Sequence, residues 1–365
     1  MADVTIVGGG IIGLSIADEL ARAGATVRVL DRADLGVEAS WAGAGMLPPG
    51  NLATATTAEA RLRGLSDKLW PNLIAWLGAK TGVDSGYRMS GALRIFDEET
   101  GRDAELATWR SEAVPAEPVD AADLEPALGV GGPAIHLPSQ SQIRNPRHLK
   151  ALIASCAAQN VELIPNVPAV AWEIDGDRVT GVRTPQGIVR SDRYCVASGA
   201  WSGGLLEPIG IELPVRPIRG QIALLRAVPL PFTRIVEVGS RYLVPRPDGR
   251  ILVGATEEDV GFQKRNTTVA VGDLLAMAIE LCPALADATL ERCWAGLRPG
   301  SPDGLPYLGR LPDFANLFVA AGHFRSGLQM SPGTARLMRQ ILLDQPTEFP
   351  LDEFSPCRHA TVGFG

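Results

Sequence analysis

Apolar residues open the chain in an almost unbroken run and then recur at helical spacing. Residues 3–7 predict a buried strand, and residues 11–23 carry apolar side chains three and four positions apart, which predicts a helix. Gly24 is placed to end that helix, and residues 26–30 predict a second strand that ends at Asp31. Together these elements predict a βαβ unit at the start of the chain.

The later pattern alternates between helix-like and strand-like segments. Helices are predicted over 59–80, 147–159, 272–281 and 333–343. Strands are predicted over 87–97, 134–143, 161–164, 168–174, 193–198, 215–226, 240–246, 250–255 and 316–321, with a hairpin over 178–190. Segments typical of α/β folds occur at the start, middle and end of the chain, and antiparallel segments fill the gaps between them.

This arrangement predicts an α/β protein with two domains. One is a Rossmann-like, nucleotide-binding domain that is discontinuous in sequence, and the other is an α+β substrate domain built on an antiparallel sheet. The nucleotide-binding domain is predicted over 1–84, 146–215 and 296–345, the substrate domain over 85–145 and 216–295, and a C-terminal tail over 346–365.

A glycine-rich turn joins the first strand to the first helix. Gly8, Gly10 and Gly13 match the G-x-G-x-x-G pattern, in which the glycines permit a tight turn, the approach of a pyrophosphate and close packing of helix on strand. The pattern is weak alone, because the chain has 40 glycines and a purely structural turn would look the same. Its place between strand and helix, with Asp31 positioned to accept ribose hydroxyls, favours a dinucleotide site, and the acid disfavours NADP.

Two further segments favour FAD over NAD. Residues 39–46 are small and apolar, which suits a loop that lies against a flat ring system. Residues 317–330 predict a strand, a glycine-flanked turn and a helix start, which would direct N–H groups and a helix dipole toward a flavin. One dinucleotide that spans both ends of the chain suits FAD better than NAD.

Composition narrows the class of protein. The net charge of −7 argues against nucleic acid as a partner, because phosphate backbones need a basic face. The start of the chain has no secretory pattern and no apolar run is long enough for a membrane span, so a cytoplasmic protein is expected. The five cysteines are scattered along the chain, which predicts reduced thiols. The four histidines do not have the spacing typical of metal ligands, so no metal site is predicted. Whether the chain forms a homo-oligomer is left open.

Several stretches together resemble the family of FAD-dependent D-amino acid oxidases and sarcosine oxidases, in its glycine oxidase branch. The resemblance extends from Val4 to about residue 343 and is carried by 7–13, 39–48, 196–202, 242–246, 294–300, 302–309 and 322–327. It implies non-covalent FAD, since no cysteine lies within 322–330, where sarcosine oxidases attach theirs.

The resemblance also implies roles for individual residues. Arg298 would hold the substrate carboxylate, Tyr242 would add a hydrogen bond to it, and Arg325 would lie near the flavin. Arg298 lies between apolar residues, and without the resemblance a structural ion pair with an internal Asp or Glu is the favoured interpretation. The residues expected to contact the cofactor are Gly8, Gly10, Ile12, Gly13, Asp31, Arg32, Ser40, Gly43, Ala44, Gly45, Met46, Ala169, Ser198, Gly199, Trp201, Arg298, His323, Phe324, Arg325, Ser326, Gly327, Leu328 and Gln329.

The expected reaction is the oxidative deamination of glycine or another small amino acid, with dioxygen as the acceptor and an imine that could serve thiamine thiazole synthesis. His323 is expected to pack rather than act as a base. Ser240 and Glu257 depart from the glycine oxidase pattern, which has a histidine and a methionine there. Two rival hypotheses remain: a D-amino acid dehydrogenase that passes electrons to a quinone, and a non-catalytic dinucleotide-binding module.

Overall fold

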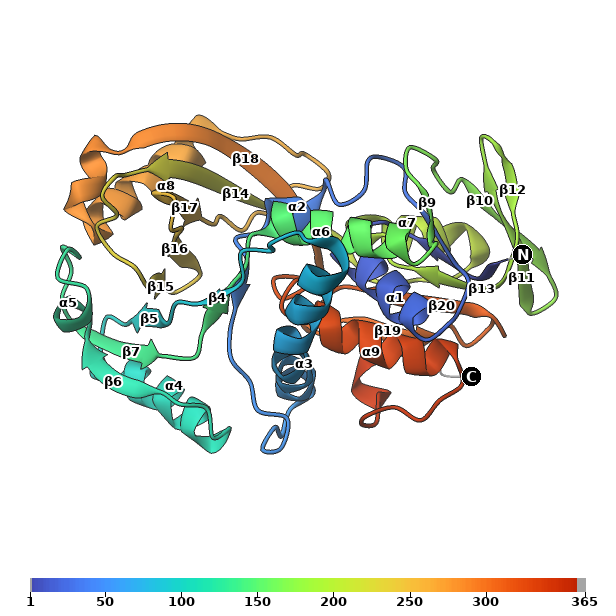
Figure 1. The fold of residues 1–365 in the computed structure, drawn as a ribbon, viewed down its shortest axis with the longest axis horizontal. Coiled ribbons are helices and arrows are strands. Elements are labelled where there is room, and N and C mark those ends of the chain that lie inside the picture. The colour runs from blue at the N-terminus through green and yellow to red at the C-terminus, as the bar shows by residue number, and fades with distance from the viewer. Residues whose placement is uncertain (1, 360–365) are drawn as a thin grey trace.

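The computed structural model describes residues 2–359 and has a six-stranded sheet near the N-terminus (Figure 1). All neighbouring strands are parallel except the pair β19–β20. In spatial order the strands are β19 (Tyr307–Arg310), β20 (Leu317–Ala321), β13 (Ser191–Val196), β1 (Ala2–Val7), β2 (Val27–Leu30) and β9 (Glu162–Ile164). These strands come from the beginning, middle and end of the chain, as the apolar runs predicted.

Both faces of this sheet are covered, which explains why most positions in its strands are apolar. One face packs against the helices α1 (Ile11–Arg22), α6 (Asn145–Ala158) and α9 (Ser331–Leu342), and α3 (Ala58–Thr81) packs on α6 and α9. The other face packs against α7 (Ser202–Leu206) and a small sheet made of β10 (Ala171–Asp175), β11 (Arg178–Thr184) and β12 (Gly187–Val189).

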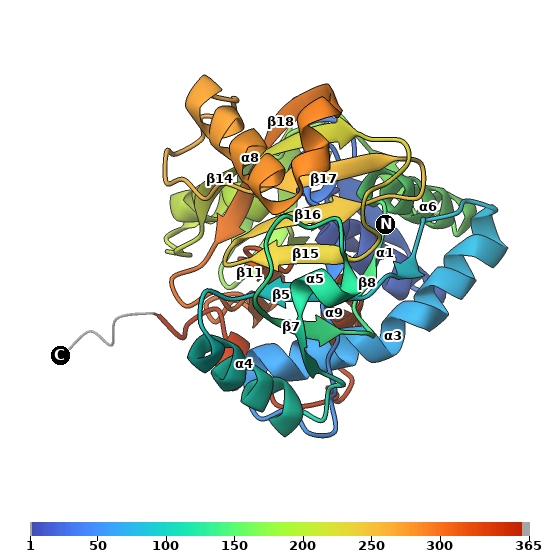
Figure 2. The same ribbon diagram turned by 90° about the vertical axis from the view of Figure 1, so that its left-hand side faces the viewer.

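A second, eight-stranded sheet lies at the opposite end of the molecule (Figures 1 and 2). Its order is β18 (Thr289–Gly300), β14 (Arg216–Arg226), β17 (Arg250–Gly254), β16 (Arg241–Pro245), β15 (Ile235–Val238), β5 (Ala92–Ile95), β7 (Pro133–Leu137) and β6 (Glu117–Asp120). The strands are antiparallel apart from the pair β15–β5. α8 (Thr268–Leu281) covers one face, and α4 (Glu99–Ser111) packs on the other.

Two of the predicted strands each correspond to two separate strands in the structure. The strand expected over 87–97 is two strands in different sheets, β4 (Arg88–Met89) and β5, and the strand expected over 134–143 divides into β7 and β8 (Ser141–Gln142). β4 and β8 join β3 (Met46–Leu47) in a small sheet. A one-dimensional pattern of alternation cannot show that a strand changes partners at a glycine, as this chain does at Gly91.

Other elements were missed altogether: α2 (Ala39–Ala42) and β3 in the segment expected to be a loop, and α4, α5 (Ala121–Leu124), α7, β6, β15, β18 and β19. β18 was missed because it contains Gly296 and Pro299, residues typical of turns. Its position at the edge of the sheet tolerates the proline. The boundary proposed at residue 296 falls inside this strand, and the division into domains stays a prediction.

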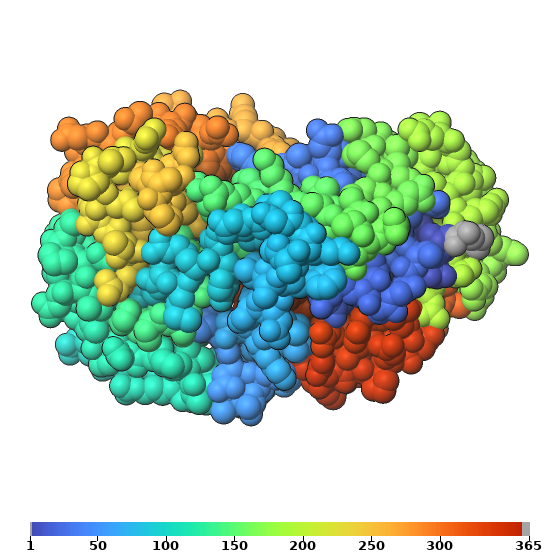
Figure 3. Space-filling model, viewed as in Figure 1, coloured from blue at the N-terminus to red at the C-terminus, as the bar shows by residue number. Residues whose placement is uncertain are grey.

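The segment after α9 returns to the first sheet. Phe354 is fully buried in the helical core, and Arg358 Nε donates to Asp303 Oδ2 at 2.7 Å. The residues 360–365 of the predicted tail lie outside the described part of the chain. In the space-filling view the light-blue segment, which includes α3, lies between the teal segment of the second sheet and the red C-terminal segment (Figure 3). No helix within residues 2–359 is long and apolar enough to cross a membrane.

Candidate active site

A cavity of about 1190 Å³ runs between the two sheets. It begins at the carboxyl ends of β1 and β2 and extends to β16 and β5 of the second sheet. Its lining includes every residue predicted for the site except Gly13. The tertiary structure therefore brings together residues from both ends and the middle of the chain, and an elongated dinucleotide fits a cavity of this extent.

The glycine turn at the first strand leaves no room for side chains. Gly8 has a φ of +118°, and a Cβ there would lie 2.3 Å from Ala197 O. A Cβ on Gly13 would lie 1.9 Å from Gly8 O, so this glycine allows helix α1 to pack on β1. Ser40 Oγ accepts the Ile11 N–H at 2.8 Å, whereas the Ile12 N–H has no acceptor among the described residues. An open N–H at a helix N-terminus is a site for an anion such as a pyrophosphate.

Asp31 at the end of β2 is held by the backbone. Its Oδ2 accepts the Gly9 N–H at 2.7 Å, and its Oδ1 accepts the Ala33 N–H at 2.9 Å. Burial raises the pKa of this carboxyl, and these two N–H groups act in the opposite direction. The neighbouring Arg32 lies over the Trp201 ring, with its guanidinium carbon 3.7 Å from the ring centroid. These residues form the end of the cavity nearest the first sheet.

The loop of Gly43–Met46 is held in place by a residue that sequence analysis did not assign. Arg246 is buried, and its Nη2 donates to Ala44 O at 2.6 Å while its Nη1 donates to Gln142 Oε1 at 2.6 Å. Burial lowers its pKa to about 9. Arg246 ends an apolar strand stretch, so the argument that singled out Arg298 could also have found it.

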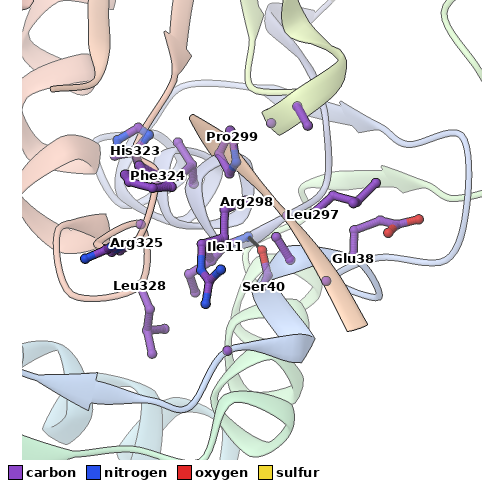
Figure 4. A pocket seen from close by; sticks show the side chains of 18 of the residues that line it. Ile11, Glu38, Ser40, Leu297, Arg298, Pro299, His323, Phe324, Arg325 and Leu328 are labelled. Atoms are coloured by element: carbon purple, nitrogen blue, oxygen red, sulfur yellow. Dashed lines mark hydrogen bonds between the residues drawn. The ribbon is translucent and has the colours of Figure 1, made fainter. Parts of the chain in front are cut away.

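The turn before α9 closes the cavity on another side (Figure 4). Phe324 has a φ of +47°, and its N–H donates to Pro299 O at 2.9 Å, which joins the turn to β18. His323 is buried and its Nε2 lies 3.0 Å from Thr334 Oγ1. Burial lowers the pKa of His323 to about 3, so the imidazole is neutral at physiological pH, as expected of a packing residue.

Arg298 reaches into the cavity from β18 (Figure 4). Its Nη1 donates to Thr256 O at 3.0 Å, and within residues 2–359 it forms no ion pair. The structural ion pair considered above is thus not found. Tyr242 is buried beside it: burial raises the pKa of the phenol, and the positive charge of Arg298 acts in the opposite direction.

Two glycines make room for this pair, and neither was predicted. A Cβ on Gly220 would lie 2.4 Å from Arg298 Nη1, and one on Gly254 would lie 2.7 Å from the Tyr242 hydroxyl. Gly220 lies inside β14 and Gly254 is the last residue of β17, and a glycine in a strand often marks the close approach of another group. That positional signal could have pointed to the site.

The far end of the cavity is lined by charged pairs that sequence analysis also missed. Arg94, Glu237 and Tyr242 are neighbours across β5, β15 and β16. Arg94 Nη2 lies 3.2 Å from Glu237 Oε2, and Arg63 Nη2 lies 2.8 Å from Glu112 Oε2. The partners are far apart in sequence, so no local pattern indicates them.

The two residues that depart from the glycine oxidase pattern both line the cavity. Ser240 lies in the connection between β15 and β16. Glu257 forms an ion pair with Arg325, whose Nε lies 2.7 Å from Glu257 Oε2. The arginine expected near the flavin is therefore already paired with a carboxylate.

A parallel sheet that ends in a glycine turn, facing a second sheet across a long cavity, defines a dinucleotide-dependent enzyme. Residues 3–341 match the family described as "DAO: FAD dependent oxidoreductase". The chain belongs to this family, and FAD is its cofactor. The expected resemblance, the FAD-dependent enzyme class and the α/β fold with a largely antiparallel second sheet are thereby confirmed.

Individual relatives are similar over nearly the whole chain. A glycine oxidase of Pseudomonas aeruginosa is 40% identical over 93% of this chain and 94% of its own length. The crystal structure of glycine oxidase from Geobacillus kaustophilus superposes with a TM-score of 0.92 at 32% identity and covers 98% of this chain and 99% of that one. A bifunctional protein ThiO/ThiG of Synechocystis is 36% identical over 99% of this chain, which matches 54% of that protein.

Proposed function

We propose that this FAD-dependent enzyme oxidises the C–N bond of glycine or another small amino acid, such as sarcosine or a small D-amino acid. The observation that carries the proposal is Arg298, a guanidinium in the cofactor cavity that no described carboxylate holds and that lies beside Tyr242. A guanidinium in such a setting binds a carboxylate through charge-assisted hydrogen bonds. The similarity to two glycine oxidases supports an amino acid as its ligand.

The cavity offers each part of FAD a distinct set of groups. The glycine turn with the open Ile12 N–H would take the pyrophosphate, Asp31 the ribose hydroxyls and Ala169 the adenine. The loop of Gly43–Met46 and the turn over 323–329 would hold the isoalloxazine. None of the five cysteines, all of which lie in the described part of the chain, lines the cavity, which supports non-covalent binding.

Bound FAD supplies an acceptor for the two electrons that leave the substrate. The protein would bind the carboxylate through Arg298 and Tyr242 and thereby orient the Cα–H bond. No side chain needs to accept a proton from Cα if the Cα hydrogen leaves as hydride, and the buried, neutral His323 agrees with this. For glycine, water and dioxygen are consumed and the products are glyoxylate, ammonia and hydrogen peroxide.

The test is an anaerobic screen in which glycine, sarcosine and D-amino acids are mixed with the yellow protein and flavin bleaching is followed. We expect bleaching by at least one small amino acid, and stoichiometric peroxide when the same mixture is repeated in air. Bleaching without peroxide would instead support a dehydrogenase that uses a quinone. If no amino acid bleaches the flavin, the proposed function is wrong.

We further propose that the imine product feeds thiamine thiazole synthesis in the cytoplasm. The similarity to a protein named ThiO/ThiG supports the role in thiazole synthesis. The five free thiols support a reducing compartment. A strain that lacks this protein should require the thiazole for growth, and growth without it would contradict the assignment.

A further inference from the structure

The arginines that line the cavity differ in whether a carboxylate holds them. Those paired with an Asp or Glu are Arg32, Arg63, Arg94, Arg216 and Arg325. In the described part of the chain, the cavity arginines without an ion pair are Arg241 and Arg298. Arg241 directly precedes Tyr242 in β16, and adjacent residues in a strand point to opposite faces. Arg298 is therefore the unpaired guanidinium on the side of Tyr242.

Arg325 is paired with Glu257 across two loops, so its guanidinium is already occupied by a carboxylate. Glu257 follows β17 and Arg325 belongs to the turn that follows β20, so the ion pair joins the two domains predicted from the sequence. Both the Nε and the Nη2 of Arg325 donate to Glu257 Oε2, the first at 2.7 Å. The side chains are 51% and 37% exposed, so the pair contributes little to the stability of the fold and its charge can be changed by substitution without unfolding the protein.

We propose that Glu257 restricts the active site to substrates with a single carboxylate. This inference rests on the proposed function, and it names the class of amino acid within it. Arg298 can receive one carboxylate, whereas a second would meet the negative charge of Glu257 and find Arg325 already occupied. Discrimination of this kind combines one attractive group with one repulsive group. Small monocarboxylic amino acids such as glycine and sarcosine can bind Arg298 and bring no second carboxylate near Glu257.

The test compares matched N-substituted glycines in the holoenzyme and in Glu257→Gln, which keeps the side-chain shape but removes its charge. Sarcosine carries an N-methyl group, and iminodiacetate carries an N-carboxymethyl group. We expect the ratio of kcat/KM for iminodiacetate to that for sarcosine to rise about tenfold or more, the size of one new charge-assisted contact. The double variant Glu257→Gln/Arg325→Gln should lose that gain.

Asp259→Asn is the matched control. Asp259 pairs with Arg216 at 3.0 Å, lies two residues from Glu257 and does not line the cavity, so its neutralisation should leave the ratio unchanged. A ratio that stays constant in Glu257→Gln, or a gain that the double variant retains, would overturn the inference.

A binding measurement separates this inference from the proposed function. The dissociation constants of acetate and malonate are obtained from the change they cause in the absorption of the bound flavin. We expect Glu257→Gln to improve malonate binding relative to acetate by a similar factor, and an unchanged ratio would contradict the inference. If the ratio changes but no amino acid is oxidised, the proposed function alone is wrong.

Discussion

The two ends of the cavity are built from different parts of the polypeptide. The nucleotide end consists mainly of backbone: glycines without room for a Cβ, an open N–H at Ile12 and a carboxylate held by N–H groups. The substrate end consists of side chains that extend from the second sheet, with Arg298 and Tyr242 at its centre. We therefore expect FAD binding at the nucleotide end to be weakened by substitutions that add side-chain atoms. Substrate binding at the other end should be weakened by substitutions that remove them.

The largest effect is expected for Arg298→Ala. Loss of one partner of a buried charge pair costs about 2–5 kcal/mol, so kcat/KM for glycine should fall by about 30-fold or more, chiefly through KM. Steady-state peroxide release measures the loss, and the flavin content should stay unchanged. A neutral amine without a carboxylate should lose far less, and equal losses on both substrates would show that Arg298 is structural.

Gly8→Ala tests the backbone end. The new Cβ would lie 2.3 Å from Ala197 O at a φ of +118°, so we expect FAD release and a fall of about 1–3 kcal/mol in the free energy of unfolding. Flavin content after gel filtration and denaturant unfolding report the two effects. Gly24→Ala is the control, because Gly24 has a φ of +90° but no atom within 4 Å of the added Cβ. FAD retained equally by both variants would argue against a backbone-built site.

Tyr242→Phe should have a moderate effect confined to the substrate end. One hydroxyl hydrogen bond contributes about 0.5–1.5 kcal/mol, which corresponds to a roughly two- to tenfold loss in kcat/KM for glycine. Tyr307→Phe is a suitable control, since the Tyr307 hydroxyl is buried, has no partner among the described residues and lies outside the cavity lining. If both variants behave alike, Tyr242 does not bind the substrate.

The smallest effect is expected for His323→Gln. The imidazole is neutral and contacts Thr334, so anaerobic stopped-flow reduction should stay within about fivefold of the original rate across pH, whereas loss of a general base costs about 10²–10⁴-fold. The pH dependence should follow the substrate amine. A hundredfold loss with FAD still bound would make His323 the base.

The sequence predicted the nucleotide end in detail. Glycines at Gly8, Gly10 and Gly13, an apolar strand before them and Asp31 after the next strand are local features, and local features determine a βαβ unit. The same local signals predicted the helices α1, α3, α6 and α9 within a few residues. The substrate end was recognised through Arg298 and Tyr242, on a resemblance rather than on spacing.

Only the tertiary structure decided how side chains pair within the second sheet and between the second sheet and the turn before α9. Glu257 with Arg325, and Arg94 with Glu237, are separated by dozens of residues and meet because strands and loops from distant segments become neighbours. The room that Gly220 and Gly254 leave for Arg298 and Tyr242 has the same origin. Hydrophobic periodicity and turn residues act over a few positions and so determine elements and a backbone-built site, whereas charge pairing depends on contacts made after those elements pack.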